Sequence, residues 1–155
     1  MRVFKSLESI PESLKGSCAV IGCFDGVHLG HRELLRRASH LASKVDSPVL
    51  AITFANHPQD VLDGSRQFRF LTTLDEKLTL LDRHGADAVL LLTFNRDFSV
   101  ISAEDFCRYA LHEVLGVQAV VVGYNFLFGW KKTGNTDLLR KQGKKLGFTV
   151  DVVQA

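Results

Sequence analysis

Runs of consecutive apolar residues recur along the chain and alternate with segments whose apolar residues fall at helical spacing. The runs occupy residues 17–22, 49–54, 88–92, 119–123 and 148–153, the last of which is interrupted by Thr149 and Asp151. Uninterrupted apolar runs of this length are typical of parallel strands that are buried on both faces. The alternation therefore predicts an α/β fold, a Rossmann-like doubly wound parallel sheet of about five strands with helices on both faces. The apolar start of the chain, before Lys15, also fits a strand followed by a capped turn.

The helices between these strands have boundaries that can be predicted from cap residues and apolar spacing. They are expected over residues 31–45, 72–84, 102–116 and 136–147. In the second helix, Thr72 or Thr73 is the expected N-cap, and Leu74, Leu78 and Leu81 form the expected buried face.

The third helix carries a variant of the capping box at its start. Ser102 is the expected N-cap, and Asp105 stands three residues later in place of the usual glutamate or glutamine. Phe106, Ala110 and Val114 form the expected apolar stripe of this helix. Residues 55–70 are expected to be a loop with little regular structure.

Composition limits the classes of protein and partner. The 155 residues are 46% hydrophobic and 23% charged, as in a globular protein, so one domain over residues 1–155 is expected. A formal net charge of +2 is too small to indicate nucleic acid or a membrane surface, which leaves small molecules as the expected partners. Cys18, Cys23 and Cys107 are odd in number and lack CxxC spacing, which favours a reducing cytoplasm. The oligomeric state is left open.

The stretch from Gly22 to His31 joins a predicted strand to a predicted helix. Gly22, Gly26 and Gly30 allow positive φ and a close approach of the backbone to a ligand, and His28 and His31 can lie on one side of a first helical turn. No Gly-Lys-Ser/Thr follows, and the glycine spacing differs from the dinucleotide fingerprint, so a P-loop kinase and a dinucleotide-dependent dehydrogenase are disfavoured. What remains is a turn that can hold an anion at a helix N-terminus.

The two histidines suggest chemistry on a phosphate. Both can donate to non-bridging phosphate oxygens, as phosphoryl or nucleotidyl transfer requires. The plainer interpretation is a tight turn with two solvated histidines. Asp25 either orders the turn or orients a histidine. Zinc held by His28, His31 and Cys23 is disfavoured because no fourth ligand has a recognisable spacing, and no metal bound by protein side chains is expected.

Two further loops follow predicted strands. Residues 55–70 include His57 and Pro58, and residues 124–135 are rich in aromatic side chains and include Lys131 and Lys132. The ligand of a doubly wound sheet lies beyond the carboxyl ends of its strands, so all three loops are expected to converge on one site. Aromatic rings beside a phosphate-binding turn suit a planar ligand such as adenine or isoalloxazine. The two lysines are interpreted either as phosphate ligands or as solvated surface charges.

Three motifs, in order along the chain, resemble those of the nucleotidyltransferase superfamily. Residues 22–31 read Gly-x-Phe-Asp-Gly-Val-His-x-Gly-His, residues 53–58 read Thr-Phe-x-x-His-Pro, and the third motif begins Gly-Tyr-Asn-Phe-x-Phe-Gly at residue 123. The first contains the His-x-Gly-His signature in the form found in bacterial FAD synthetases, the bifunctional riboflavin kinase/FMN adenylyltransferases. The three motifs together extend over most of the chain, which makes the resemblance more specific than His-x-Gly-His alone.

The resemblance implies that the phosphate of FMN attacks the α-phosphorus of ATP in line, giving FAD and pyrophosphate, with Mg²⁺ on the phosphates. It implies that His28 and His31 hold the ATP phosphates and stabilise the transition state. The residues that it places at the ATP site are Gly22, Phe24, Asp25, Gly26, Gly30, Gly123 and Asn125. Those that it places at the flavin site are His57, Pro58 and Phe128.

The chain differs from the family pattern at two places. Ala55 and Asn56 stand where the family usually has an acidic residue and then proline. After Ala155 the resemblance leads us to expect a Ser/Thr-rich segment that ends in an arginine on the triphosphate, and then a riboflavin kinase domain. Kinase activity is therefore not expected of these residues. A related nucleotidyltransferase with another phosphate acceptor, or a nucleotide- or flavin-binding module without turnover, remains an alternative.

Overall fold

The computed structural model describes residues 1–24, 29–55 and 73–154. Within these ranges the backbone forms one sheet of six strands in the order β1-β4-β3-β2-β5-β6, and every neighbouring pair is parallel. The strands are β1 (Arg2–Phe4), β2 (Cys18–Ile21), β3 (Val49–Phe54), β4 (Ala88–Leu92), β5 (Ala119–Gly123) and β6 (Thr149–Val153). The predicted doubly wound parallel sheet is confirmed.

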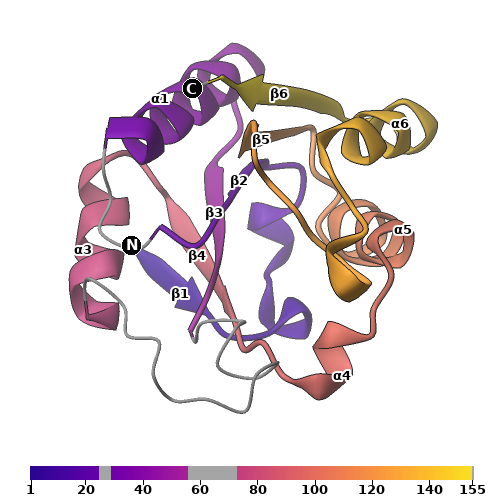
Figure 1. Ribbon diagram of the computed structural model, residues 1–155. Coiled ribbons are helices and arrows are strands. Elements are labelled where there is room, and N and C mark those ends of the chain that lie inside the picture. The colour runs from indigo at the N-terminus through magenta and orange to yellow at the C-terminus, as the bar shows by residue number, and fades with distance from the viewer. Residues whose placement is uncertain (25–28, 56–72, 155) are drawn as a thin grey trace.

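Helices cover both faces of this sheet. The longer ones are α1 (Leu29–Val45), α3 (Leu74–Arg83), the π-helix η3 (Phe106–Val114) and α6 (Thr136–Leu146). The shorter ones are η1 (Leu7–Ser9), η2 (Glu12–Leu14), α4 (Arg96–Ser99), α5 (Ala103–Asp105) and η4 (Trp130–Lys132). Figure 1 shows α1 and α3 on one side of the sheet and α5 and α6 on the other. Each side has its own cluster of buried apolar residues.

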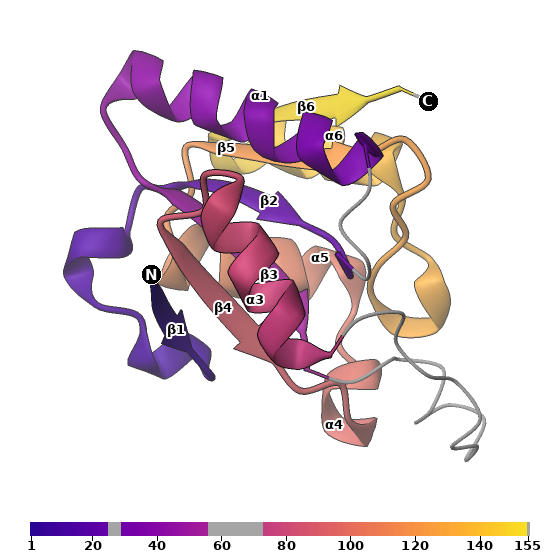
Figure 2. The same cartoon turned by 90° about the vertical axis from the view of Figure 1, so that its left-hand side faces the viewer.

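The chain reverses its direction across the sheet between β2 and β5. It passes from β2 outward to β3 and β4, then returns to the other side of β2 and continues outward from β5 to β6. The ends of β2 and β5 therefore lie side by side while their following loops lead to opposite faces, which is where ligands bind in such sheets. Helix α1 packs on both strands, as Figure 2 shows.

The sixth strand, β1, lies at the edge and pairs with β4 through Val3 and Val89. It is only three residues long and mostly exposed, so it lacks the long apolar run that marks the other strands. The strand that the start of the chain suggested is confirmed, and it raises the expected count of about five to six.

The predicted N-cap residues are confirmed in two helices, whereas the predicted buried face of α3 is partly wrong. Thr73 caps α3 by accepting from the amide of Glu76, and Ser102 accepts from the amide of Asp105 at 3.0 Å. In α3, however, the fully buried side chains are Lys77 and Leu81. The expected face was wrong at Leu74, which is 38% exposed.

The third helix differs from the expected α-helix because most of it is π-helical. The amide of Leu115 donates to the carbonyl of Ala110, five residues back, at 3.0 Å. This wider turn lengthens the repeat beyond 3.6 residues, so the buried line runs through Cys107, Leu111 and Leu115. Of the predicted stripe, Ala110 is buried, whereas Phe106 and Val114 pack at the margin of the core.

In the described part of the chain, no helix has both the length and the apolar character needed to cross a membrane.

The close approach of α6 to β6 gives a test of the packing. A methyl group at Gly143 would lie 2.5 Å from the backbone oxygen of Phe148. Gly143→Ala should therefore destabilise the protein by about 1–3 kcal/mol through overpacking, although alanine in an exposed helix would stabilise it by about 1 kcal/mol. Urea unfolding measures the difference. Exposed Lys145→Ala on the same helix is the control, and a gain in stability for Gly143→Ala would show that α6 does not pack this closely.

Candidate functional site

The turn after β2 packs on the buried aromatic ring of Phe24. Phe24 has a left-handed backbone, with φ of 53°, and its side chain is completely buried. A methyl group at Gly22 would lie 3.3 Å from this ring, so glycine leaves the ring its space. The ring also meets that of His31 edge-on, with 5.2 Å between centroids. Phe24 therefore positions the turn and His31, the predicted catalytic histidine that lies on α1, and its buried ring leaves only its backbone for the predicted ATP site.

The N-terminus of α1 lies directly beyond this turn. The helix has 17 residues and carries no acidic side chain in its first turn, so no carboxylate of that turn offsets the positive end of its dipole, which favours an anion. Gly30 is exposed there, and His31 is half-buried. Asp25, Gly26 and His28, which were predicted to complete this part of the site, lie outside the described residues.

The loop after β5 begins beside that turn. The side-chain oxygen of Asn125 folds back to 3.3 Å from the position of a Cβ on Gly123. Phe126 donates its amide to the carbonyl of Gly123 at 3.1 Å, which closes a tight turn. Gly123 and Asn125, both predicted ATP-site residues, are thus brought together at the carboxyl end of β5, the strand next to β2.

The same loop then folds back on itself. The backbone of Phe128 exchanges two hydrogen bonds with Gly134, of 3.1 and 2.8 Å. A methyl group at Gly134 would lie 2.6 Å from the Cβ of Ala103, so the loop packs closely on the start of α5. Lys131 and Lys132 lie at the exposed tip, where the ammonium of Lys131 stands 4.6 Å from the ring of Trp130.

A row of phenylalanine rings connects the end of β3 with this loop. Neighbouring centroids are 5.5 Å apart from Phe54 to Phe98, 6.2 Å from Phe98 to Phe106 and 5.9 Å from Phe106 to Phe128, and Phe126 stacks on Phe128 at 5.2 Å. Only the end at Phe128 was predicted as part of the site. Phe54, Phe98 and Phe106 come from three separate elements, β3, α4 and η3, and no sequence spacing connects them, whereas Phe126 belongs to the same loop as Phe128. His57 and Pro58, predicted on the flavin side, lie outside the described residues.

A hollow of about 530 Å³ lies next to part of this row. Phe98 and Phe106 line it together with Leu92, at the end of β4, and Tyr109. Among the described residues, none that was predicted for the site lines this hollow.

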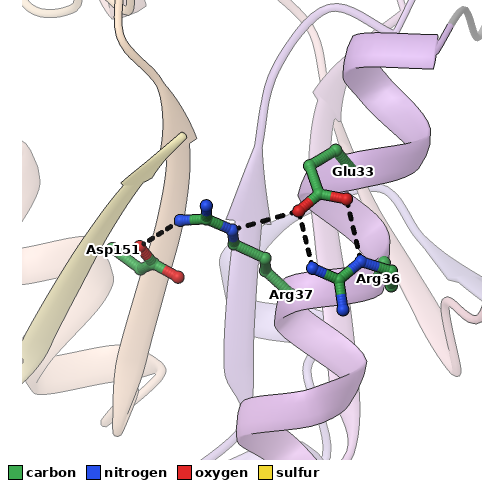
Figure 3. A network of polar contacts seen from close by, with 4 residues as sticks. All are labelled: Glu33, Arg36, Arg37 and Asp151. Carbon is green, nitrogen blue, oxygen red and sulfur yellow. Dashed lines mark hydrogen bonds and ion pairs between the residues drawn. The ribbon is translucent and has the colours of Figure 1, made fainter. Parts of the chain in front are cut away.

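One ion pair, between Arg37 and Asp151, joins the first half of α1 to β6 at the edge of the sheet, and Glu33 and Arg36 complete the network within α1 (Figure 3). Glu33 accepts hydrogen bonds from Arg36, at 2.7 and 2.8 Å, and from Arg37, at 3.2 Å. Arg37 also donates to Asp151 of β6 at 2.9 Å. The hydrogen bonds from Arg36, followed by those from Arg37, lower the pKa of Glu33 to about 2. Glu33 lies only two residues beyond His31, so this network fixes the helix that carries the histidine.

Comparisons with known proteins agree on one family. A sequence model described as FAD synthetase matches residues 10–155. The chain is 33% identical over 155 residues to the bifunctional riboflavin kinase/FMN adenylyltransferase of Escherichia coli K12. The alignment covers 99% of this chain and 50% of that protein. The corresponding protein of Buchnera aphidicola subsp. Schizaphis graminum is 31% identical over 150 residues, with 97% and 48% covered. The chain thus spans about half the length of these curated relatives.

A solved structure has the same fold. It is described as a macrolide-efflux protein from Streptococcus pneumoniae, and it superposes with a TM-score of 0.86 at 26% identity. The alignment covers 99% of this chain and 50% of that one.

The network around Glu33 should make stability depend on acid pH. Because its folded-state pKa is about 2, against 4.5 as the ordinary value, the stabilisation is complete above pH 4.5 and is lost as the pH falls toward 2. Glu33→Gln should therefore lower the thermal midpoint at pH 7 and have little effect near pH 2. Exposed Glu8→Gln is the control. A Glu33→Gln difference of the same size at both pH values would contradict the ion-pair interpretation.

Proposed function

Because the chain belongs to the FAD synthetase family, we propose that it transfers the adenylyl group of ATP to FMN, giving FAD and pyrophosphate. An oxygen of the FMN phosphate forms a bond to the α-phosphorus, and the bond from that phosphorus to the oxygen bridging to the β-phosphorus breaks. Pyrophosphate leaves with that bonding pair. Only this transfer is proposed for these residues, since the family that they match is FAD synthetase.

The observation that carries the proposal is the meeting of two loops at the point where the strand order reverses. The turn after β2 leads into α1, which carries His31, and the loop with Asn125 and Phe128 follows β5, the strand next to β2. Charge that spreads over phosphate oxygens in the transition state is stabilised by such fixed donors.

The individual roles follow from this geometry and from the family. We propose that His28 and His31 donate to the ATP phosphates as the catalytic residues. The backbone around Gly22, Phe24, Asp25, Gly26 and Gly30 would hold the nucleotide together with Gly123 and Asn125. Lys131 and Lys132, exposed at the tip of their loop, would approach the phosphate side.

The flavin is proposed to lie on the aromatic side of the site. Phe128 ends the phenylalanine row, and its ring offers an apolar face to an isoalloxazine. His57 and Pro58 are proposed to contact the flavin from the loop after β3. The row makes this side of the site well suited to a large planar acceptor.

Magnesium is proposed to enter with ATP. In the ranges that the structure describes, no group of three or more His, Cys, Asp or Glu side chains could hold a metal ion. Mg²⁺ commonly keeps several waters and takes its other ligands from substrate phosphates, which suits a site of this kind. The ion would neutralise charge on the pyrophosphate that leaves.

We also propose the extent of the domain, its partners and its location. One sheet with an apolar core on each face extends from β1 to β6, which supports a single domain over residues 1–155. ATP and FMN are its proposed partners. A cytoplasmic location is supported by Cys18 and Cys107, which are buried thiols.

Histidine variants test the proposed chemistry. The protein, incubated with ATP, Mg²⁺ and FMN, should form FAD that is detected by chromatography. His31→Ala and His28→Ala should each lower kcat by about 10²–10³-fold, the usual effect of removing one transition-state donor, which is a much larger effect than their effect on stability.

The matched control is His40→Ala, an exposed histidine further along α1, which should keep kcat. Measurable ATP binding with no FAD formed by the wild type would sink the proposal and favour a binding module without turnover. Calorimetry with FMN and other small phosphates would reveal a nucleotidyltransferase with a different acceptor.

A further inference from the structure

Lys77 of α3 is a lysine in the protein interior. Its side chain is 1% exposed, and it lies where the backbones of β2 and β3 separate. Its ammonium donates to the carbonyl of Cys23 at 3.0 Å, to the carbonyl of Phe54 at 2.9 Å and to the hydroxyl of Thr53 at 3.4 Å. An ammonium has three N–H groups, and these three oxygens lie within hydrogen-bonding distance of it.

These contacts continue the sheet beyond its last backbone bonds. The ladder between β2 and β3 ends at Ile21 and Ile52, followed by a bond from the amide of Gly22 to the carbonyl of Ile52 at 3.1 Å. The next carbonyl, that of Cys23, receives the hydroxyl of Thr53 at 3.0 Å and the ammonium of Lys77. Side chains of β3 and α3 thus link the two chain segments at the carboxyl ends of β2 and β3.

The bond to Cys23 also fixes the residue that supports the site. The carbonyl of Cys23 belongs to the peptide that leads into Phe24, so holding this carbonyl restrains the left-handed φ of Phe24. The Phe24 ring in turn contacts the ring of His31. A continuous set of contacts therefore runs from Lys77 through Cys23 and Phe24 to His31.

Simple packing does not require an ammonium at this position. A methionine would fill much the same volume, and burying a charge is unfavourable unless hydrogen bonds compensate for it. Cys23 belongs to the first motif, residues 22–31, and Phe54 belongs to the second, residues 53–58. The ammonium of Lys77 therefore supplies hydrogen-bond donors to the carbonyls of these two residues, which a methionine could not do.

We propose that Lys77, with Thr53, is a positioning residue for adenylyl transfer, which joins the turn after β2 to the end of β3 and so sets the place of His31. This inference rests on the proposed function. Displacement of a catalytic group by about 1 Å can cost about 10²-fold in rate, so a residue of this kind acts on kcat more than on KM.

Lys77→Met tests the proposal in the full chain. At a temperature where circular dichroism shows both proteins folded, kcat for FAD formation should fall at least about tenfold, with a smaller change in KM for ATP. Hydrogen exchange followed by mass spectrometry should show faster exchange in a peptide that spans residues 22–31. The matched control is Leu81→Ala, which removes a fully buried side chain from the same helix. It should lower the thermal midpoint and leave kcat of the folded protein within about twofold.

A second pair of variants covers the case in which Lys77→Met does not fold. Thr53→Val removes the hydroxyl at constant shape and should lower kcat by about three- to tenfold, whereas Thr53→Ser restores the hydrogen bond and should recover most of the rate. Equal rates for Thr53→Val and Thr53→Ser, or an effect of Lys77→Met no larger than that of Leu81→Ala, would overturn the proposal.

The two proposals fail in different ways. If the wild type forms no FAD, the proposed function fails, and the exchange of residues 22–31 in Lys77→Met still reports whether Lys77 holds the turn. If the wild type forms FAD and Lys77→Met matches it in both kcat and exchange, only the positioning role is lost.

Discussion

In the middle of the sheet, Cys18 pairs with Ala119 and Val20 with Val121, which joins β2 to β5 although β3, β4 and their helices lie between them in sequence. This parallel pairing places the carboxyl ends of β2 and β5 side by side, and the loops that follow these strands lead to opposite faces of the sheet. A histidine on the first turn of α1 and an asparagine after β5 can share a ligand only because of it. The carboxyl ends of these two strands carry the three features of the candidate site. They are the N-terminus of α1, the buried Phe24 ring and the folded-back loop at Phe128.

The elements whose signals are local could be predicted from the sequence. Strands buried on both faces leave long apolar runs, and Thr73 and Ser102 cap helices through their own side chains. The faces of helices were harder to predict because they depend on helical geometry. The π-helical turn shifted the buried line to Cys107 and Leu111, and in α3 a lysine took the buried place four residues before Leu81.

The site divides in the same way between local and tertiary features. The glycines and histidines of residues 22–31 lie close together in sequence, so their pattern could be interpreted directly. Phe54, Phe98 and Phe106 come together only in the folded protein, and no spacing in the sequence connects them. In the sequence Lys77 resembles an ordinary surface lysine of a helix, and only the fold brings it to the carbonyls of Cys23, after β2, and Phe54, at the end of β3. The positions of such supporting residues depend on tertiary contacts, so the sequence alone does not reveal them.

The central claim is that ATP and FMN meet at the carboxyl ends of β2 and β5. A crystal structure of the protein with FMN and a non-hydrolysable ATP analogue tests it most directly. We expect the phosphates at the N-terminus of α1, beside His31, and the flavin ring against Phe128. Nucleotide bound elsewhere, such as in the basic hollow formed by Arg140, Lys141 and Lys144, would contradict the claim.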